Sequence, residues 1–342
     1  MRLLNCCLCA LFAVWVATAA DPALLDMVPA DSGVIIGISV ERIASSRVGQ
    51  TIYRQMEVES QALMGVAGNE QLEFIRGIRD VLITAPANNR GRRGLVLVRG
   101  SFPPAALQIF AQGSVESSFQ GIRVFTRQQK QPLTVALLEP SLLLGGDPQS
   151  VRAAIARRAS SGAPDPLLMA KAREMSALYD AWLVARASLA DLAQHAPRPE
   201  IGTLAGMEKS IEQIGTGLSF GPMLRISIDL ATRTEKEAKA MGDALKMLIG
   251  LAASGKNAQE IRPMLNALQL RVDANKVKLD LDIPEEHVIA AIEQQARTRR
   301  TRTTAGSSEI VIQGSKPEAT GVTVHSSPAD MGVVTLPAPK PQ

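Results

Sequence analysis

The sequence predicts an α+β protein built from two similar units, each a mainly antiparallel sheet backed by helices. Short segments of alternating apolar residues occur in close pairs, as expected for hairpins. Helical patterns separate these pairs, and the order strand, helix, hairpin, helix, hairpin, helix occurs twice. The predicted parts are a signal peptide (1–20), a first unit (21–160), a second unit (161–297) and a flexible tail (298–342).

Residues 1–20 have the three parts of a secretory signal peptide. Arg2 gives the positive start, an apolar stretch follows from Cys6 to Ala17, and small residues precede Asp21. The stretch is shorter than the roughly 20 residues that span a bilayer, so we expect cleavage near Ala19 or Ala20, with retention as an anchor as the alternative. The protein is therefore predicted to be exported to the periplasm or the extracellular space.

Cysteine usage and charge exclude several classes of function. Cys6, Cys7 and Cys9 all lie in the signal peptide, so the mature chain is expected to have no disulfide and no cysteine-ligated metal. Cleavage removes one Arg and no acid, which lowers the formal net charge from +4 to +3. This near balance, with only 3% aromatic residues, argues against nucleic-acid binding, which normally uses a strongly basic face and stacking platforms.

The first unit begins with the turn Pro29–Gly33 and a β-branched segment, Val34–Val40, which predicts a buried strand. A helix is expected to follow through Tyr53 and Met56. The later elements are expected to be strands Asp80–Ala85 and Gly94–Arg99, a helix from Pro103 to Phe110, strands Ile122–Thr126, Leu133–Leu138 and Leu142–Leu144, and a helix from Pro148 to Ala159. Asp147 is the predicted N-cap of that last helix.

The second unit follows a Gly- and Pro-rich break at 160–166 and repeats the order of elements. Its expected elements are helix Leu167–Leu178, strand Ala181–Ala187, helices Ser188–Gln194 and Leu204–Ile211, strands Gly215–Phe220 and Leu224–Leu230, a helix after Thr234, helix Ala258–Asn266, strands Leu268–Val272 and Val277–Ile283, and a helix after Pro284. Thr234 and Glu237 have capping-box spacing. The similar segments Val151–Ile155 and Val288–Ile292, each in the last helix of its unit, predict an internal repeat.

From Thr298 onward the composition changes to Ser, Thr, Gly, Pro and Lys, which is typical of a flexible tail. Three short apolar pieces interrupt it, at Ile310–Ile312, Val322–Val324 and Val333–Leu336. Each piece has the length and composition to add a strand to a sheet edge of this chain or of a partner. The alternative is a terminus that stays disordered throughout.

The segment Gly217–Gly221 has the G-x-S-x-G pattern that surrounds the nucleophile of serine hydrolases, and His287 follows later in the chain. That nucleophile requires a turn from a strand into a helix. Here Pro222 and an alternating apolar segment predict a second strand instead, so Ser219 is interpreted as a strand residue before a hairpin turn. We assign no catalytic residue.

No metal or cofactor site is predicted either. The three histidines, His195, His287 and His325, lack the paired spacing of zinc ligands. Gly145–Pro148 lies between a strand and a helix, but it lacks the lysine and the glycine spacing of a phosphate-binding loop. Its Asp is better explained as a helix cap.

Two clusters of arginines are candidate contacts with an anionic surface. They are Arg90, Arg92 and Arg93 on a predicted hairpin tip, and Arg297, Arg299, Arg300 and Arg302 at the end of the last helix. Clustered cations are attracted to anionic lipid headgroups, to lipopolysaccharide or to an acidic partner. A solvated surface is the alternative, because functional basic patches are usually longer.

Two stretches resemble a group of exported bacterial proteins of uncharacterised function. The first is Val28–Asp31 leading into Val34–Ile38, with Ser45–Gln50 after it; the second is Leu144–Pro148 leading into Val151–Ile155. The resemblance extends from about Asp21 to Ala296 and implies export and this α+β plan. It implies no activity, cofactor or site residue.

The leading hypothesis is therefore an exported, non-enzymatic binding or envelope-organising protein. Its partner would be a protein or another envelope component, with contact to an anionic membrane surface as a possibility and with no nucleic acid. The alternatives are an envelope hydrolase that uses Ser219, and a lipid carrier or chaperone with an apolar groove. The ligand, the oligomeric state and whether the two units share one sheet are left open.

Overall fold

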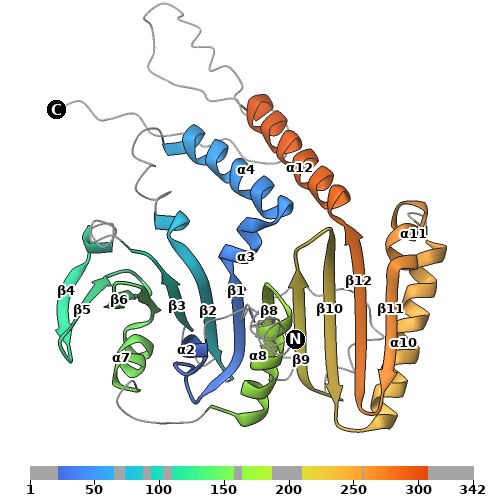
Figure 1. Cartoon of the computed structure of the whole chain (residues 1–342), viewed down its shortest axis with the longest axis horizontal. Helices are drawn as coiled ribbons and strands as arrows, with labels where there is room; N and C mark the ends of the chain where they lie inside the picture. Colours follow the sequence, from blue (N-terminus) through green and yellow to red (C-terminus); the bar gives the residue numbers. More distant parts are fainter. Residues whose placement is uncertain are drawn as a thin grey trace, which may run out of the picture. The chain divides into compact units, whose positions relative to one another are not determined.

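The computed structural model describes residues 22–64, 74–87, 94–102, 110–157, 164–186, 210–255 and 258–306 (Figure 1). The fold is α+β with a large antiparallel sheet, which confirms the predicted fold class. The described residues up to Ala296 form one compact unit. The predicted signal peptide, 1–20, and the tail beyond Gly306 lie outside the described residues.

The described strands form a single twelve-stranded sheet in which every pair of neighbours is antiparallel. Its order is β11-β12-β10-β9-β8-β1-β2-β3-β7-β6-β5-β4. The strands are β1 (Ser32–Ser39), β2 (Ile78–Pro86), β3 (Leu95–Gly100), β4 (Val115–Phe119), β5 (Ile122–Arg127), β6 (Leu133–Glu139), β7 (Leu142–Gly146), β8 (Ala181–Ala185), β9 (Ile211–Ser219), β10 (Met223–Thr232), β11 (Leu268–Asp273) and β12 (Lys276–Pro284).

The two halves of the chain share this sheet, which the sequence left open. Strand β1 pairs with β8, with Ile36 opposite Leu183 at the middle of the pairing. From this seam outward, the first half runs β1-β2-β3-β7-β6 and the second runs β8-β9-β10-β12-β11. The strand orders of the two halves therefore match, and β4 and β5 extend only the first half.

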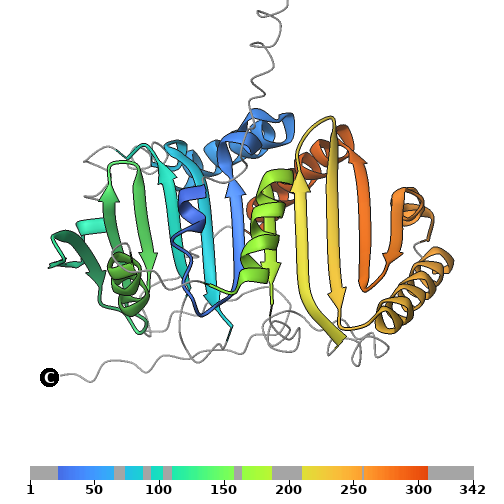
Figure 2. The ribbon, with the colours of Figure 1, turned by 60° about the horizontal axis from the view of Figure 1, so that its bottom comes forward.

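The helices are α2 (Pro22–Leu25), α3 (Val40–Ser45), α4 (Arg47–Met64), α7 (Pro148–Arg157), α8 (Pro166–Leu178), α10 (Glu235–Ser254), α11 (Ala258–Ala267) and α12 (Glu285–Gly306). Figure 2 shows α7 and α8 on the same side of the sheet. Both contribute to one core, in which Val151 of α7 and Leu168 of α8 are fully buried with Leu97 and Leu144 of the sheet. We call this side of the sheet the α8 face.

The opposite side, the α10 face, is apolar in both halves. In the first half it carries Val98 and Leu143, which pack with Phe102. In the second half α10 places Met241 against Val277 of β12. Because side chains alternate along a strand, each half offers one apolar surface here for helices or loops to cover.

Local signals in the sequence are reproduced closely. Asp147 caps α7, and its Oδ1 accepts hydrogen bonds of 3.0 Å from the N–H groups of Gln149 and Ser150. Thr234 and Glu237 form the predicted capping box at the start of α10. Both predicted caps are therefore confirmed, and each satisfies N–H groups that the helix itself leaves free.

Some element boundaries differ from the predictions. Strand β4 and helix α2 were not expected. Strand β8 ends at Ala185 and not at Ala187. Ile211, the expected last residue of a helix, is the first residue of β9. Helix α12 continues to Gly306, so the helical part of this segment is longer than the sequence indicates. The predicted helix 188–194 and most of the helices predicted at 103–110 and 204–211 lie outside the described residues.

A largely buried ion pair connects the two halves at one end of the seam. Arg42 of α3 pairs with Asp180, which directly precedes β8. The other carboxylate oxygen of Asp180 accepts a hydrogen bond of 2.6 Å from the N–H of Phe220, in the turn between β9 and β10. One carboxylate thus connects a helix of the first half to two segments of the second.

Candidate functional site

The α8 face changes character at the boundary between β9 and β10. One row of cross-strand neighbours runs Leu144, Leu97, Leu82, Gly37, Trp182, Gly217, Ser227, Asp280, Gln269, from β7 through the seam to β11. On the same three strands, the neighbouring row two residues further along each strand consists of Asp229, Lys278 and Arg271. Directly opposed residues lie on the same face of a sheet. The surface that forms the core in the first half is therefore polar on β10, β12 and β11.

We call this surface the polar face. Its residues, which alternate along the three strands, are Arg225, Ser227 and Asp229 of β10, Lys276, Lys278, Asp280 and Asp282 of β12, and Gln269, Arg271 and Asp273 of β11. They comprise four cationic and four anionic groups, so the face has no net charge. In the described part of the chain, no helix packs over these three strands on this side, and only α8 reaches their margin (Figure 2).

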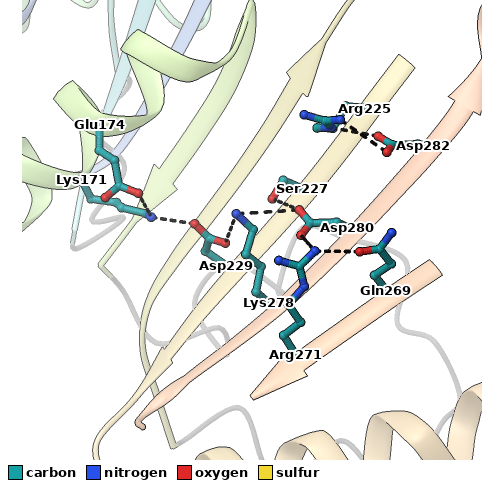
Figure 3. Close-up of polar contacts among 10 residues, drawn as sticks. All are labelled: Lys171, Glu174, Arg225, Ser227, Asp229, Gln269, Arg271, Lys278, Asp280 and Asp282. Atoms are coloured by element: carbon teal, nitrogen blue, oxygen red, sulfur yellow. Dashed lines mark hydrogen bonds and ion pairs between the residues drawn. The ribbon is translucent and has the colours of Figure 1, made fainter. Parts of the chain in front are cut away.

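The polar face is organised by a ladder of ion pairs (Figure 3). Lys171 of α8 donates to Asp229 Oδ2 at 2.7 Å and to Glu174 at 2.8 Å. Lys278 continues the ladder, with its Nζ 3.9 Å from Asp229 Oδ1 and 3.8 Å from Asp280 Oδ1. The side chains of Lys171, Asp229 and Asp280 are only 15%, 21% and 16% exposed. These central charges are partly shielded from water, which strengthens their interactions.

The outer residues of the ladder hold its centre in place. The fully buried hydroxyl of Ser227 donates to Asp280 Oδ1 at 2.7 Å. Arg271 Nη2 donates to Gln269 at 2.7 Å and lies 3.9 Å from Asp280 Oδ2. Asp280 therefore has neighbours from β10, β11 and β12, and its carboxylate is fixed in one orientation.

Arg225 and Asp282 form a separate pair at the end of the polar face near the β9–β10 turn. The guanidinium donates from Nε to Asp282 Oδ1 at 2.9 Å and from Nη2 to Oδ2 at 3.5 Å. The hydrogen bond and charge of Asp282 raise the pKa of Arg225 above its ordinary value. The Arg225 side chain is nevertheless more than half exposed, so this pair contributes little to stability and leaves donor capacity unused.

Opposing effects set the pKa of Lys171. Burial lowers the pKa of its ammonium group, but the hydrogen bonds and charges of Asp229 and Glu174 outweigh burial, so the net shift is upward. Because the pKa is higher in the folded state, these contacts stabilise the fold. The stabilisation is complete below the unfolded lysine pKa of about 10.5 and is lost only as the pH rises through the folded pKa. Lys171 is consequently cationic at neutral pH.

Replacing Asp229 with Asn is expected to lower the pKa of Lys171 relative to the intact protein. The variant removes the strongest contacts that raise this pKa, while the burial that lowers it remains. The pKa is measured from the side-chain carbon shifts of Lys171 by NMR over an alkaline titration. The matched control is Asp282→Asn, which lies outside the Lys171 contacts and should leave the pKa unchanged. An unchanged pKa in Asp229→Asn would contradict the ladder.

The polar face retains unused hydrogen-bonding capacity. Asp229 Oδ1 is buried and has no hydrogen-bond donor among the described residues; its nearest cation is Lys278 at 3.9 Å. Arg271 and Lys278 also present exposed N–H groups beyond their present contacts. Such an arrangement can hold a partner with charges of both signs. In the described residues, no cluster of three or more His, Cys, Asp or Glu side chains has the arrangement of a metal site.

The two predicted arginine clusters lie mostly outside the described residues and side chains. Arg90, Arg92 and Arg93 lie outside the described residues. Arg297 is exposed on α12. Arg299, Arg300 and Arg302 also belong to α12, but their side chains are not described. Arg297 does not belong to the polar face.

Ser219 ends β9, and the chain turns at once into β10. The strand-to-helix turn that a hydrolase nucleophile requires is therefore not formed at this residue. Gly217 has a different explanation, because a Cβ there would come within 2.3 Å of the Tyr179 ring. His287 is exposed in the first turn of α12, and His195 and His325 lie outside the described residues.

No protein-family model matches the chain. No curated protein matches it in sequence either. Among solved structures, crystal form IV of TP0453 is similar over 78% of this chain and 95% of its own, with a TM-score of 0.50 and 12% identity. Crystal form III gives a TM-score of 0.49 over 79% and 97% of the two chains at 12% identity, and form I gives 0.47 over 82% and 99% at 13%. At this identity the likeness to form IV shows a shared fold alone.

Within the described residues, the helices are too short or too polar to cross a membrane.

Proposed function

We propose that the protein is an exported, non-enzymatic binding protein that uses the polar face to hold a partner protein. The observation that carries the proposal is the change along the α8 face. The strands of the first half bury leucines against α7 and α8, whereas β10, β12 and β11 present an ordered ladder of charges on the same side. A polar surface with an ordered centre and exposed outer groups, such as Arg225 and Arg271, is suited to recognition.

The chemistry of the polar face favours a partner with charges of both signs. Its four cationic and four anionic groups produce no net attraction for a polyanion, so nucleic acids and strongly anionic polymers are poor candidates. It carries no aromatic side chain on which a sugar or a base would stack. A protein surface that places carboxylates near Arg225 and Arg271, and cationic groups near Asp273 and Asp282, complements it.

Preorganisation further supports binding. The central charges already have fixed orientations, because Ser227 and Lys171 hold Asp280 and Asp229 through hydrogen bonds. A partner therefore does not have to order these side chains, and ordering would otherwise cost about 0.5–1.5 kcal/mol for each. The exposed outer groups, Arg225 and Arg271, are available for direct contacts.

Affinity capture with matched variants tests this function. The full-length protein, a chain truncated at Ala296 and two charge variants are each used to capture partners from an envelope extract. The swap Arg225→Asp with Asp282→Arg keeps an ion pair but reverses its polarity, whereas Lys278→Glu breaks the ladder. We expect the truncated chain to retain the same partner and both charge variants to lose it at least tenfold. Equal capture by all four proteins, or capture lost only on truncation, would contradict a role of the polar face.

Export is tested separately by the mass of the mature protein. We expect the protein recovered from the periplasm or the medium to begin at Ala20 or Asp21, because small residues precede this point after an apolar stretch. Intact-mass spectrometry measures the first residue. Recovery from the cytosol with Met1 in place would refute export while leaving the properties of the polar face unaffected.

A further inference from the structure

A solvent-open cavity of about 730 Å³ lies between α3, α4 and the start of β2. Its volume is within the range of about 300–1,000 Å³ that is typical of small-molecule sites. None of its lining residues belongs to the polar face, so the two surfaces are independent. Val40 and Ile78 provide apolar wall, and most of the remaining lining is polar or charged.

Arginines predominate among the charged groups of this cavity. Arg76 pairs with Glu57, so its charge is largely compensated. Arg54 is held in place by uncharged acceptors, the carbonyl of Gln50 at 3.4 Å and Thr51 Oγ1 at 3.1 Å. The Arg79 side chain is exposed and makes no ion pair or hydrogen bond with the described residues. The cavity thus offers two guanidinium groups without a carboxylate partner.

Two further groups limit what the cavity accepts. Tyr53 is half-buried in the wall, and burial raises the pKa of its phenol, which therefore remains a neutral hydrogen-bond donor at physiological pH. Glu41 contributes an opposing negative charge, so that with Glu57 the lining totals three cations and two anions. A ligand with one anionic group is balanced by this lining, whereas a polyanion is not.

We infer that this cavity binds a small organic oxyanion, a carboxylate or a phosphate monoester with a short apolar body. Arg54 and Arg79 supply the donors, because a guanidinium matches the geometry of two oxygens on one carbon or phosphorus. Tyr53 donates a further hydrogen bond, and Val40 and Ile78 contact the apolar body. No covalent step is involved.

Calorimetry with simple probes tests the site on the intact mature protein. Phenyl phosphate and benzoate are the charged probes, and benzyl alcohol is the neutral one. The test variant is Arg54→Gln with Arg79→Gln, and the matched control is Arg233→Gln, an exposed arginine of the second half. We expect both charged probes to bind, with Kd at least tenfold higher in the double variant and unchanged in the control.

Vesicles distinguish a free ligand from a lipid headgroup. If phosphatidylglycerol vesicles, but not phosphatidylcholine vesicles, sediment the intact protein and the double variant stays in solution, the oxyanion is a headgroup. Binding of the soluble probes alone assigns a free small molecule. The inference would be overturned if benzyl alcohol bound as tightly as the charged probes. It would also be overturned if the double variant bound the probes and vesicles as well as the intact protein does. Because none of these residues lies on the polar face, either result leaves the partner-binding proposal intact.

Discussion

Replacing Trp182 with Ala is expected to lower the free energy of unfolding by about 3–5 kcal/mol, the usual cost of truncating a buried aromatic residue. The side chain lies at the seam of the sheet and is only 3% exposed. Its indole covers Gly37 of β1 so closely that a Cβ there would come within 2.3 Å of the ring. The indole N–H has no hydrogen-bond partner among the described residues, so packing accounts for the loss.

Urea unfolding followed by circular dichroism measures this effect. Trp182 is the only tryptophan of the chain after removal of the predicted signal peptide, because the other is Trp15. Its fluorescence therefore reports on the seam, and in the intact protein its transition should coincide with that of the dichroism signal, as expected for one cooperative unit. Trp182→Phe should lower the free energy of unfolding by less than Trp182→Ala does. A loss below about 1 kcal/mol in Trp182→Ala, a small fraction of the expected cost, would show that the seam is loosely packed.

Replacing Asp180 with Ala is expected to cost about 3 kcal/mol, because it removes one partner of a largely buried ion pair. The Asp180 side chain is 10% exposed and its partner Arg42 is 26% exposed. Arg42 Nε already lacks a hydrogen bond among the described residues. The variant therefore leaves a poorly solvated cation without compensation and also frees the N–H of Phe220.

An exposed pair provides the control for Asp180. Arg123 and Glu116 connect β5 and β4 at 2.7 Å, but about half or more of each side chain is exposed. Arg123→Ala should therefore leave the free energy of unfolding nearly unchanged, because solvent screens this pair. Thermal or urea unfolding of both variants gives the comparison. Similar decreases in the free energy of unfolding for Asp180→Ala and Arg123→Ala would contradict a larger contribution of the Asp180 ion pair.

Most strands and helices could be predicted from local patterns, because alternation and helix caps depend on neighbouring residues. The hairpin β11–β12 and the capping box at Thr234 are examples. Strand β4 was missed because its exposed residues, from Val115 to Phe119, carry no apolar alternation. The pairing of β1 with β8 joins segments about 150 residues apart, and no local signal specifies such a contact.

The candidate site was missed for a related reason. Its alternating polar residues are visible in the sequence, as in Arg225, Ser227 and Asp229 of β10 and Lys278, Asp280 and Asp282 of β12. The apolar residues between them predict the strands but do not show which charges meet. A polar alternation is also the ordinary pattern of a solvated sheet face, so the strand order and the position of α8 were needed to show which charges meet.

The most direct test of the account is site-specific photo-crosslinking in the cells that produce the protein. A benzoylphenylalanine is placed at Gln269 on the polar face or, as a control, at the exposed Lys246 of α10. We predict that Gln269 gives a discrete cross-linked partner, that Lys246 gives none, and that the swap Arg225→Asp with Asp282→Arg abolishes the adduct while leaving the unfolding midpoint unchanged. No adduct at Gln269, or an adduct that persists in the folded swap variant, would contradict the polar face as the recognition surface.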